Sequence, residues 1–212
     1  MAQLAMLARA PSAPPAALAL TMRLRLETRD AHDRIKANPQ LQRLIAPDLT
    51  REEYRALLAR LFGHHAPAET SLAEAMDLLP PAMDLPRRLR RTALMAVDLA
   101  ALGFSPVRIE ALPRCAGMAV RRREQAWGLL YALEESRLAG PAIACHLSGL
   151  LGLRPATGAA CMAPNRSEAG PLRRGFKAML DEAGAIGELD AEAVVDAARL
   201  AFERLDRWVA GG

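Results

Sequence analysis

Apolar side chains recur along most of this chain at steps of three and four residues, which is the spacing of one face of an α-helix. The first such segment contains Leu24, Ala31 and Ile35, and it stops before Pro39. A proline cannot continue a helix from within, so the segment should end there. The pattern predicts a first helix over residues 21–37.

The next helix is marked by a start signal. Thr50 is followed three residues later by Glu53, the arrangement of a capping box. This helix is expected to continue, with a kink at Pro67, to Leu79, where two prolines end it. The same periodicity predicts four further helices, over residues 86–102, 120–151, 172–183 and 190–210. The inner face predicted for the helix over 86–102 consists of Leu89, Ala93, Ala96, Val97 and Ala100.

Composition supports an all-α fold. Leu and Ala, which favour helices, supply most of the apolar residues, and aromatic residues are only 4% of the chain. A length of 212 residues suits one domain with a substantial core. We therefore predict an all-α, single-domain helical bundle over residues 21–212.

The first 20 residues differ from the rest of the chain. They are rich in Ala and Pro, and Pro11, Pro14 and Pro15 interrupt any apolar run, so they do not resemble a signal peptide. We expect a disordered N-terminal extension over residues 1–20. No later segment offers about 18 uninterrupted apolar residues, so no membrane span is expected.

Charge and cysteine content narrow the range of partners. The formal net charge is +4, and acidic and basic residues alternate along most of the chain, so no nucleic-acid partner is expected. The arginine groups form either a solvated surface or a docking site for an acidic partner. Cys115, Cys145 and Cys161 lie far apart without metal-binding spacing, which favours a reducing, cytoplasmic location.

His32 is the first candidate for chemistry. It follows the apolar positions of its helix closely enough to point partly inward, and a neutral imidazole is a common ligand of heme iron. Arg25 lies two turns earlier, where its guanidinium could meet a heme propionate. A lone histidine in a helix is, however, more often a surface residue or a core residue with satisfied hydrogen bonds.

A second candidate segment lies within the helix predicted over 120–151. Ser136, Ala139 and Gly140 leave a stretch of backbone bare, and Pro141 adds a kink. Small residues let a flat ligand approach the main chain closely. The same residues are equally suited to tight packing between helices.

Together these segments resemble the heme oxygenase family, particularly the bacterial branch associated with bacteriophytochromes. The matching pieces lie within residues 24–151 and follow one another in the same order as in the family. A weaker similarity extends over residues 170–180. The matching pieces are Leu24…Thr28…His32, Leu49-Thr50-Arg51-Glu52-Glu53-Tyr54, Leu112-Pro113-Arg114-Cys115 and Leu130-Tyr131-Ala132-Leu133-Glu134-Glu135-Ser136-Arg137-Leu138-Ala139-Gly140.

The resemblance implies a heme held between the first helix and the kinked helix, with His32 as the iron ligand. It implies that Ser136, Ala139 and Gly140 form the distal catalytic segment. It also implies that the basic group Arg173, Arg174 and Lys177 lies near the propionates, with Arg174 and Lys177 one turn apart and able to share a face. The implied reaction cleaves heme to biliverdin, iron and carbon monoxide with O2 and a reductant. Implied partners are an electron donor, such as ferredoxin with its reductase or ascorbate, and a phytochrome as biliverdin acceptor.

Three residues depart from the family pattern. Glu135 stands where a glycine is usual, Ala139 replaces the first glycine of a pair, and Lys36 occupies a position that is often acidic. If Glu135 points toward the iron, its carboxylate could ligate the iron, fill the oxygen site or carry an unpaired charge into an apolar pocket. If it points to solvent instead, it matters little. Two alternatives therefore stay open: a catalytically inactive heme-binding or regulatory protein that keeps the fold, and a pocket that has lost heme and holds another flat ligand or a partner helix.

Overall fold

The computed structural model describes residues 18–137, 139–163 and 166–211. The described residues contain helices and no strand, which confirms the all-α prediction. The α-helices are α1 (Leu20–Glu27), α2 (Arg29–Ala37), α3 (Pro39–Gln42), α4 (Arg51–Glu74), α5 (Leu85–Arg88), α6 (Arg91–Ala101), α7 (Pro106–Glu110), α8 (Arg123–Ser136), α9 (Gly140–Leu151), α10 (Arg166–Ala185) and α11 (Ala191–Ala210). Short 3-10 turns are η1 (Arg43–Ile45), η2 (Met76–Leu78), η3 (Pro81–Met83), η4 (Pro155–Thr157) and η5 (Ala160–Met162).

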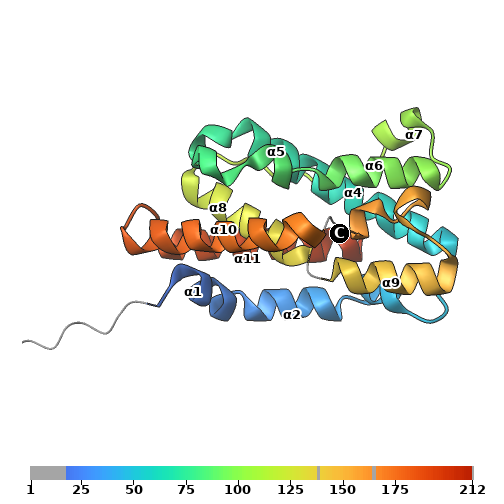
Figure 1. The fold of residues 1–212 in the computed structure, drawn as a ribbon, viewed down its shortest axis with the longest axis horizontal. Helices are drawn as coiled ribbons and strands as arrows, with labels where there is room; N and C mark the ends of the chain where they lie inside the picture. Colours follow the sequence, from blue (N-terminus) through green and yellow to red (C-terminus); the bar gives the residue numbers. More distant parts are fainter. Residues whose placement is uncertain (1–17, 138, 164–165, 212) are drawn as a thin grey trace, which may run out of the picture.

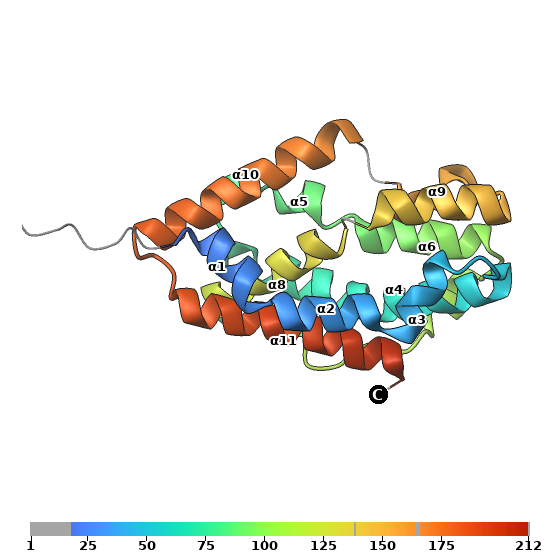
Figure 2. The ribbon, with the colours of Figure 1, turned by 90° about the horizontal axis from the view of Figure 1, so that it is seen from below.

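Helix α8 lies in the middle of the bundle and packs along α11 (Figures 1 and 2). Every residue from Ala126 to Glu134 is buried. A Cβ added at Gly128 would lie 2.6 Å from the Cβ of Ala197 and 2.7 Å from the Val194 carbonyl oxygen. The two helix backbones are therefore in close contact at this glycine.

Two clusters of apolar side chains form the core. One joins α1, α8, α10 and α11, and includes Trp127 and Phe176 with ring centroids 5.9 Å apart. The other joins α4, α6 and α9, and includes Tyr54, whose hydroxyl donates to the Gly158 carbonyl at 2.8 Å. Helix α11 contributes to both clusters, so it connects the two halves of the bundle.

The start of α4 confirms the predicted capping box. The Glu53 backbone N–H donates to Thr50 Oγ1 at 3.2 Å, and the Thr50 backbone N–H donates to Glu53 Oε2 at 2.8 Å. Pro67 lies inside α4, as expected, but the helix ends at Glu74 rather than Leu79. Residues 21–37 form α1 and α2, which are separated only by a turn at Thr28.

The prediction of one helix over residues 86–102 is wrong in two respects. The segment is divided into α5 and α6, because the carboxylate of Glu69 accepts the backbone N–H groups of Arg91 and Thr92, both at 3.1 Å, and so begins a new helix. Its predicted inner face is also displaced, since Val97 is exposed while Asp98 is fully buried. Asp98 is inside because its carboxylate accepts the N–H groups of Ala160 and Cys161, which lie in η5.

The helix predicted over 120–151 is likewise divided, into α8 and α9. Its interruption precedes Pro141, which lies in the first turn of α9. A proline lacks a backbone N–H and is well suited to the first turn of a helix, so it starts α9 instead of kinking a continuous helix.

The ends of the chain agree with the predictions only in part. Of the extension predicted over 1–20, residues 1–17 lie outside the described residues, and Leu20 already begins α1. Helices α10 and α11 correspond to the two predicted closing helices, but α10 begins at Arg166, earlier than residue 172. No helix among the described residues has the length and apolar character needed to cross a membrane.

The close contact at Gly128 gives a stability prediction. Gly128→Ala should lower the free energy of unfolding by about 1–3 kcal/mol, because the added methyl meets backbone atoms of α11. Gly149→Ala is the matched control, since a Cβ there meets nothing within 4 Å and alanine favours the helix by roughly 0.5–1 kcal/mol. Urea unfolding measures both. Equal effects of the two substitutions would contradict close packing of α8 on α11.

Candidate functional site

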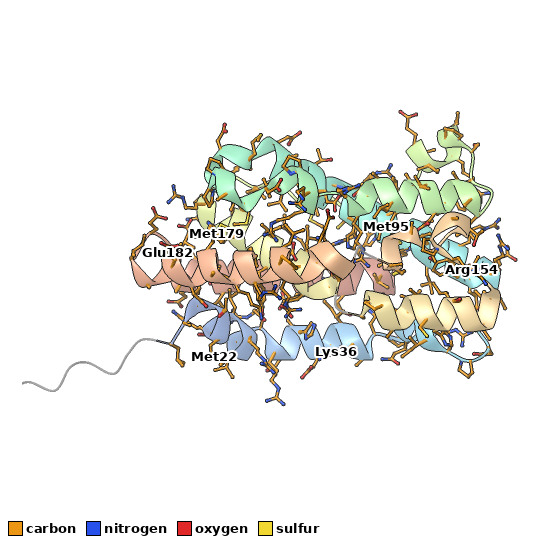
Figure 3. The ribbon with its side chains drawn as sticks, in the orientation of Figure 1. Met22, Lys36, Met95, Arg154, Met179 and Glu182 are labelled. Atoms are coloured by element: carbon orange, nitrogen blue, oxygen red, sulfur yellow. The ribbon has the colours of Figure 1, made fainter. Side chains whose placement is uncertain are left out.

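A cavity of about 810 Å³ lies between the N-terminal helices and α8, α10 and α11. One wall comes from α1 and α2, and Met22 and Lys36, which are labelled in Figure 3, both belong to this wall. Glu135 of α8 and Lys177 of α10 line it from the other helices, and Phe202 of α11 adds an aromatic ring. Five helices thus meet around this space.

His32 of α2 lines the cavity, and its ring centroid lies 5.5 Å from that of Phe202. Burial, with a smaller contribution from the Lys36 ammonium, lowers the pKa of His32 below its usual value. The imidazole is therefore neutral at pH 7, the form that binds a metal ion. Lys36 itself pairs with Asp33 at 3.2 Å.

The helices that carry His32 are fixed at both ends. At the start of α1, the backbone N–H and hydroxyl of Thr21 donate to the two carboxylate oxygens of Asp181 in α10, at 2.8 and 2.9 Å. After α2, the Asn38 side chain donates to Asp206 of α11 at 2.7 Å. Between them Thr28 is buried, and its hydroxyl donates to a backbone carbonyl one turn earlier. His32, one turn after Thr28, is held in place by these contacts.

Basic side chains surround the cavity, and they differ in whether they already have an acidic partner. Arg29 and Lys36 both pair with Asp33. Arg25 and Lys177 also line the cavity, and neither has a carboxylate within 4.0 Å among the described residues. Two cations are therefore available to bind an anionic ligand.

Lys177 lies four residues after Arg173, so the two share one face of α10, and both line the cavity. Arg174, predicted from the sequence to lie beside the propionates, is exposed and does not line the cavity. Its guanidinium instead lies close to Gly170, 3.4 Å from where a Cβ would be. Arg173 is thus the arginine that the helix presents to this space.

Glu135 faces the cavity and forms an ion pair with Arg173, with 2.9 Å between Oε1 and Nη2. Its side chain is 16% exposed. Tyr131, four residues earlier on α8, lines the same space, and burial together with the nearby Glu135 carboxylate raises its pKa to about 12. Tyr131 is therefore a neutral phenol, in edge-to-face contact with Phe202.

The neighbouring Glu134 points into the protein and forms a buried ion pair with Arg88 of α5, at 3.1 Å. Arg88 is 2% exposed and also donates to the carbonyls of Met83 and Leu172. Arg137 pairs with Glu134 at 3.3 Å as well. These contacts fix the rotation of the last turn of α8, and neighbouring residues on a helix point about 100° apart, so Glu135 is directed to the cavity.

The structure does not bring the three residues predicted for the distal segment to the cavity wall. Ser136 accepts a hydrogen bond from Arg91 at 3.3 Å and donates to a carbonyl within α8. Gly140 is buried, and a Cβ there would lie 2.9 Å from the Met162 carbonyl oxygen. Ala139 is exposed. Their catalytic role stays a prediction.

A family model described as heme oxygenase matches residues 18–211. The chain belongs to the heme oxygenase family. The match includes α1 to α11 and so every helix that lines the cavity.

Solved structures of heme oxygenases share this fold. The enzyme from Neisseria meningitidis, solved with bound NO and CO, is 22% identical, with a TM-score of 0.69 over 91% of each chain. Heme oxygenase-1 from the cyanobacterium Synechocystis, solved in complex with heme, is 16% identical, with a TM-score of 0.69 over 91% of each chain. No curated protein matches the chain.

Within this heme oxygenase fold, His32, Arg25, Glu135 and Lys177 line one cavity, although they come from four different helices. Arg173, a member of the basic group predicted from the resemblance, lines it too, whereas Tyr131 and Phe202 were not identified from the sequence. The spacing of Tyr131 four residues before Glu135 is a signal that could have identified it. Phe202 gives no such signal, because its position depends on the packing of α11.

The orientation of α8 gives the second prediction. Glu134→Gln should lower the free energy of unfolding by roughly 3–5 kcal/mol, because the Arg88 guanidinium is then left buried without its counter-ion. The control is Glu52→Gln, since the Glu52 side chain is 85% exposed and its ion pair with Arg55 should contribute little. Denaturant unfolding monitored by circular dichroism compares them. Similar small effects in both would show that the Arg88–Glu134 pair does not fix the end of α8.

Proposed function

We propose that this protein binds heme in the cavity beside His32 and cleaves it oxidatively to biliverdin, iron and carbon monoxide. The observation that carries the proposal is a neutral imidazole on the wall of a cavity of about 810 Å³ that also holds two cations without an acidic partner among the described residues. Membership in the heme oxygenase family supports the same conclusion.

The residues present fit a heme. The cavity volume falls within the range of roughly 300–1,000 Å³ that small-molecule sites occupy. A heme needs a nitrogen ligand for iron, which His32 offers, and cationic partners for two propionates, which Arg25 and Lys177 offer. Tyr131 and Phe202 supply apolar surface for the ring.

Bound heme supplies the iron that activates oxygen and the porphyrin ring that is oxidised. The protein's part is to hold the ring in one orientation and to limit water around it. His32 would hold the heme through its iron, and Arg25 and Lys177 would bind its propionates and so limit the ring's rotation. The buried rings of Tyr131 and Phe202 exclude water from that part of the cavity.

The distal segment remains Ser136, Ala139 and Gly140 in this proposal. Their small side chains suit close approach of the main chain to a flat ring. Electrons come from an external donor, such as ferredoxin with its reductase or ascorbate. A phytochrome is the biliverdin acceptor that fits the sequence resemblance.

A second candidate function is heme binding without turnover. Glu135 favours it, because a carboxylate inside the cavity is a potential competitor for oxygen at the iron. The two functions share heme binding through His32, and they differ only in whether the bound heme is degraded once reductant and air are supplied.

A hemin titration and subsequent addition of ascorbate or a ferredoxin reductase system under air test the proposal. The parent protein should give a saturable Soret band that is replaced by biliverdin absorbance. His32→Ala should lose the Soret band, while His146→Ala should keep it, because His146 lies on α9 and bonds to the Ala46 carbonyl. A stable Soret band without biliverdin would select the non-catalytic function, and absence of heme binding would overturn both.

The position of Lys177 on α10 gives a further prediction. Lys177→Ala should weaken hemin binding by roughly 3- to 10-fold, because one propionate loses a charged partner. Arg174→Ala, on the exposed side of the same helix, should leave the dissociation constant unchanged. Absorbance titration measures both constants. A larger loss in the Arg174 variant would show that the propionates lie elsewhere on α10.

A further inference from the structure

Glu135 is an acidic side chain in the cavity that also holds His32. A carboxylate is a competent ligand for ferric iron, and this one is largely shielded from water, with 16% of its side chain exposed. Glu135 of α8 and His32 of α2 line the same cavity. An iron bound by His32 would therefore lie within the influence of a second potential ligand from α8.

Helix α8 cannot turn Glu135 out of the cavity. The preceding residue, Glu134, is held by Arg88 and Arg137, and the next residue, Ser136, is held by Arg91. Rotating the last turn of α8 would break all of these contacts. Because the helix itself is fixed, the position of the Glu135 carboxylate depends only on the conformation of the Glu135 side chain and on its ion-pair partner, Arg173.

That partner, Arg173, is itself held in a fixed place. Phe176, three residues later on α10, is 1% exposed and packs against Trp127 of α8 and under the Arg88 guanidinium. The Leu172 carbonyl accepts a hydrogen bond from Arg88 at 2.8 Å. These contacts set the register of α10, so the Arg173 guanidinium meets Glu135 at 2.9 Å from a defined direction.

We propose that Arg173 is a positioning residue that holds the Glu135 carboxylate away from the iron bound by His32 and so keeps the iron's second axial position open. The proposal rests on heme binding as proposed above. When the guanidinium is absent, a Glu135 oxygen replaces the water at the iron, which then has one imidazole and one carboxylate ligand. No electron is transferred in this exchange, and the displaced water leaves to solvent.

Ferric heme complexes of four proteins test this: the parent, Arg173→Met, Arg173→Lys and the double variant Arg173→Met with Glu135→Gln. Arg174→Met is the matched control on the exposed side of α10. The probe is imidazole, a neutral ligand that competes for the axial position without responding directly to the loss of a positive charge. Absorption and electron paramagnetic resonance spectra report the ligand on the iron, and circular dichroism confirms the fold of each variant.

Arg173→Met should show the spectrum of carboxylate-bound ferric heme, and its dissociation constant for imidazole should rise by about tenfold or more, because the probe must displace Glu135. The double variant should recover the parent's spectrum and affinity, and Arg173→Lys should recover most of both. Arg174→Met should resemble the parent.

Three results would overturn the inference. The first is a parent-like spectrum and imidazole affinity in Arg173→Met, and the second is persistence of the change in the double variant, which would indicate a general effect on the cavity. The third is a carboxylate-bound spectrum already in the parent. Failure of the parent and all variants to bind hemin through His32 would instead overturn the proposed function, and the titration separates that outcome from the other three.

Discussion

The buried ion pair between Arg88 and Glu134 determines how the central helix faces the rest of the molecule. Removing two charges from water is costly, and the cost is offset only when the remaining hydrogen-bonding positions are used. Arg88 meets this condition, because its donors reach Glu134 and the carbonyls of Met83 and Leu172, and its guanidinium lies over Phe176. One side chain thereby ties α5, α8 and α10 together at the point where α8 ends.

As a consequence, the two adjacent glutamates, Glu134 and Glu135, lie in different environments. Glu134 lies in the buried cluster, while Glu135, about 100° further around the helix, lies in the cavity. The sequence Glu-Glu carries no sign of this difference. It arises because Arg88 and Arg137 approach one side of α8 and Arg173 approaches the other.

The helices and the family could be predicted from the sequence because they depend on local features. The periodicity of apolar residues, the capping box at Thr50 and the motif around His32 each lie within a short segment. The wrong boundaries have a different origin: Glu69 begins α6, and Asp98 turns the inner face of that helix toward η5. A periodicity argument assigns charged residues to the solvent side, so buried charges that bond to backbone N–H groups are systematically misplaced.

The cavity was predictable only where a residue belonged to a motif. His32 and Glu135 lie in segments that resemble the family, whereas Arg173 became significant only when the fold placed it beside Glu135. The two are 38 residues apart, and Arg88 and Glu134 are 46 apart. Pairing at such separations depends on helix register, which Phe176 sets for α10 through its packing in the core. No local pattern in the sequence carries that information.

Helix α10 contributes two basic side chains to the cavity. Lys177 and Arg173 lie one turn apart on it, the first without a carboxylate partner among the described residues and the second paired with Glu135. A ligand that binds Lys177 through a carboxylate therefore lies next to a guanidinium that already holds an acid. If a propionate drew the Arg173 guanidinium away from Glu135, the Glu135 carboxylate would lose its partner inside the cavity. In the proposed heme complex, Lys177 and Arg25 would reduce that competition, because neither has a carboxylate partner among the described residues. Under the proposed function, the same arrangement would let the cavity contain the Glu135 carboxylate beside a bound heme.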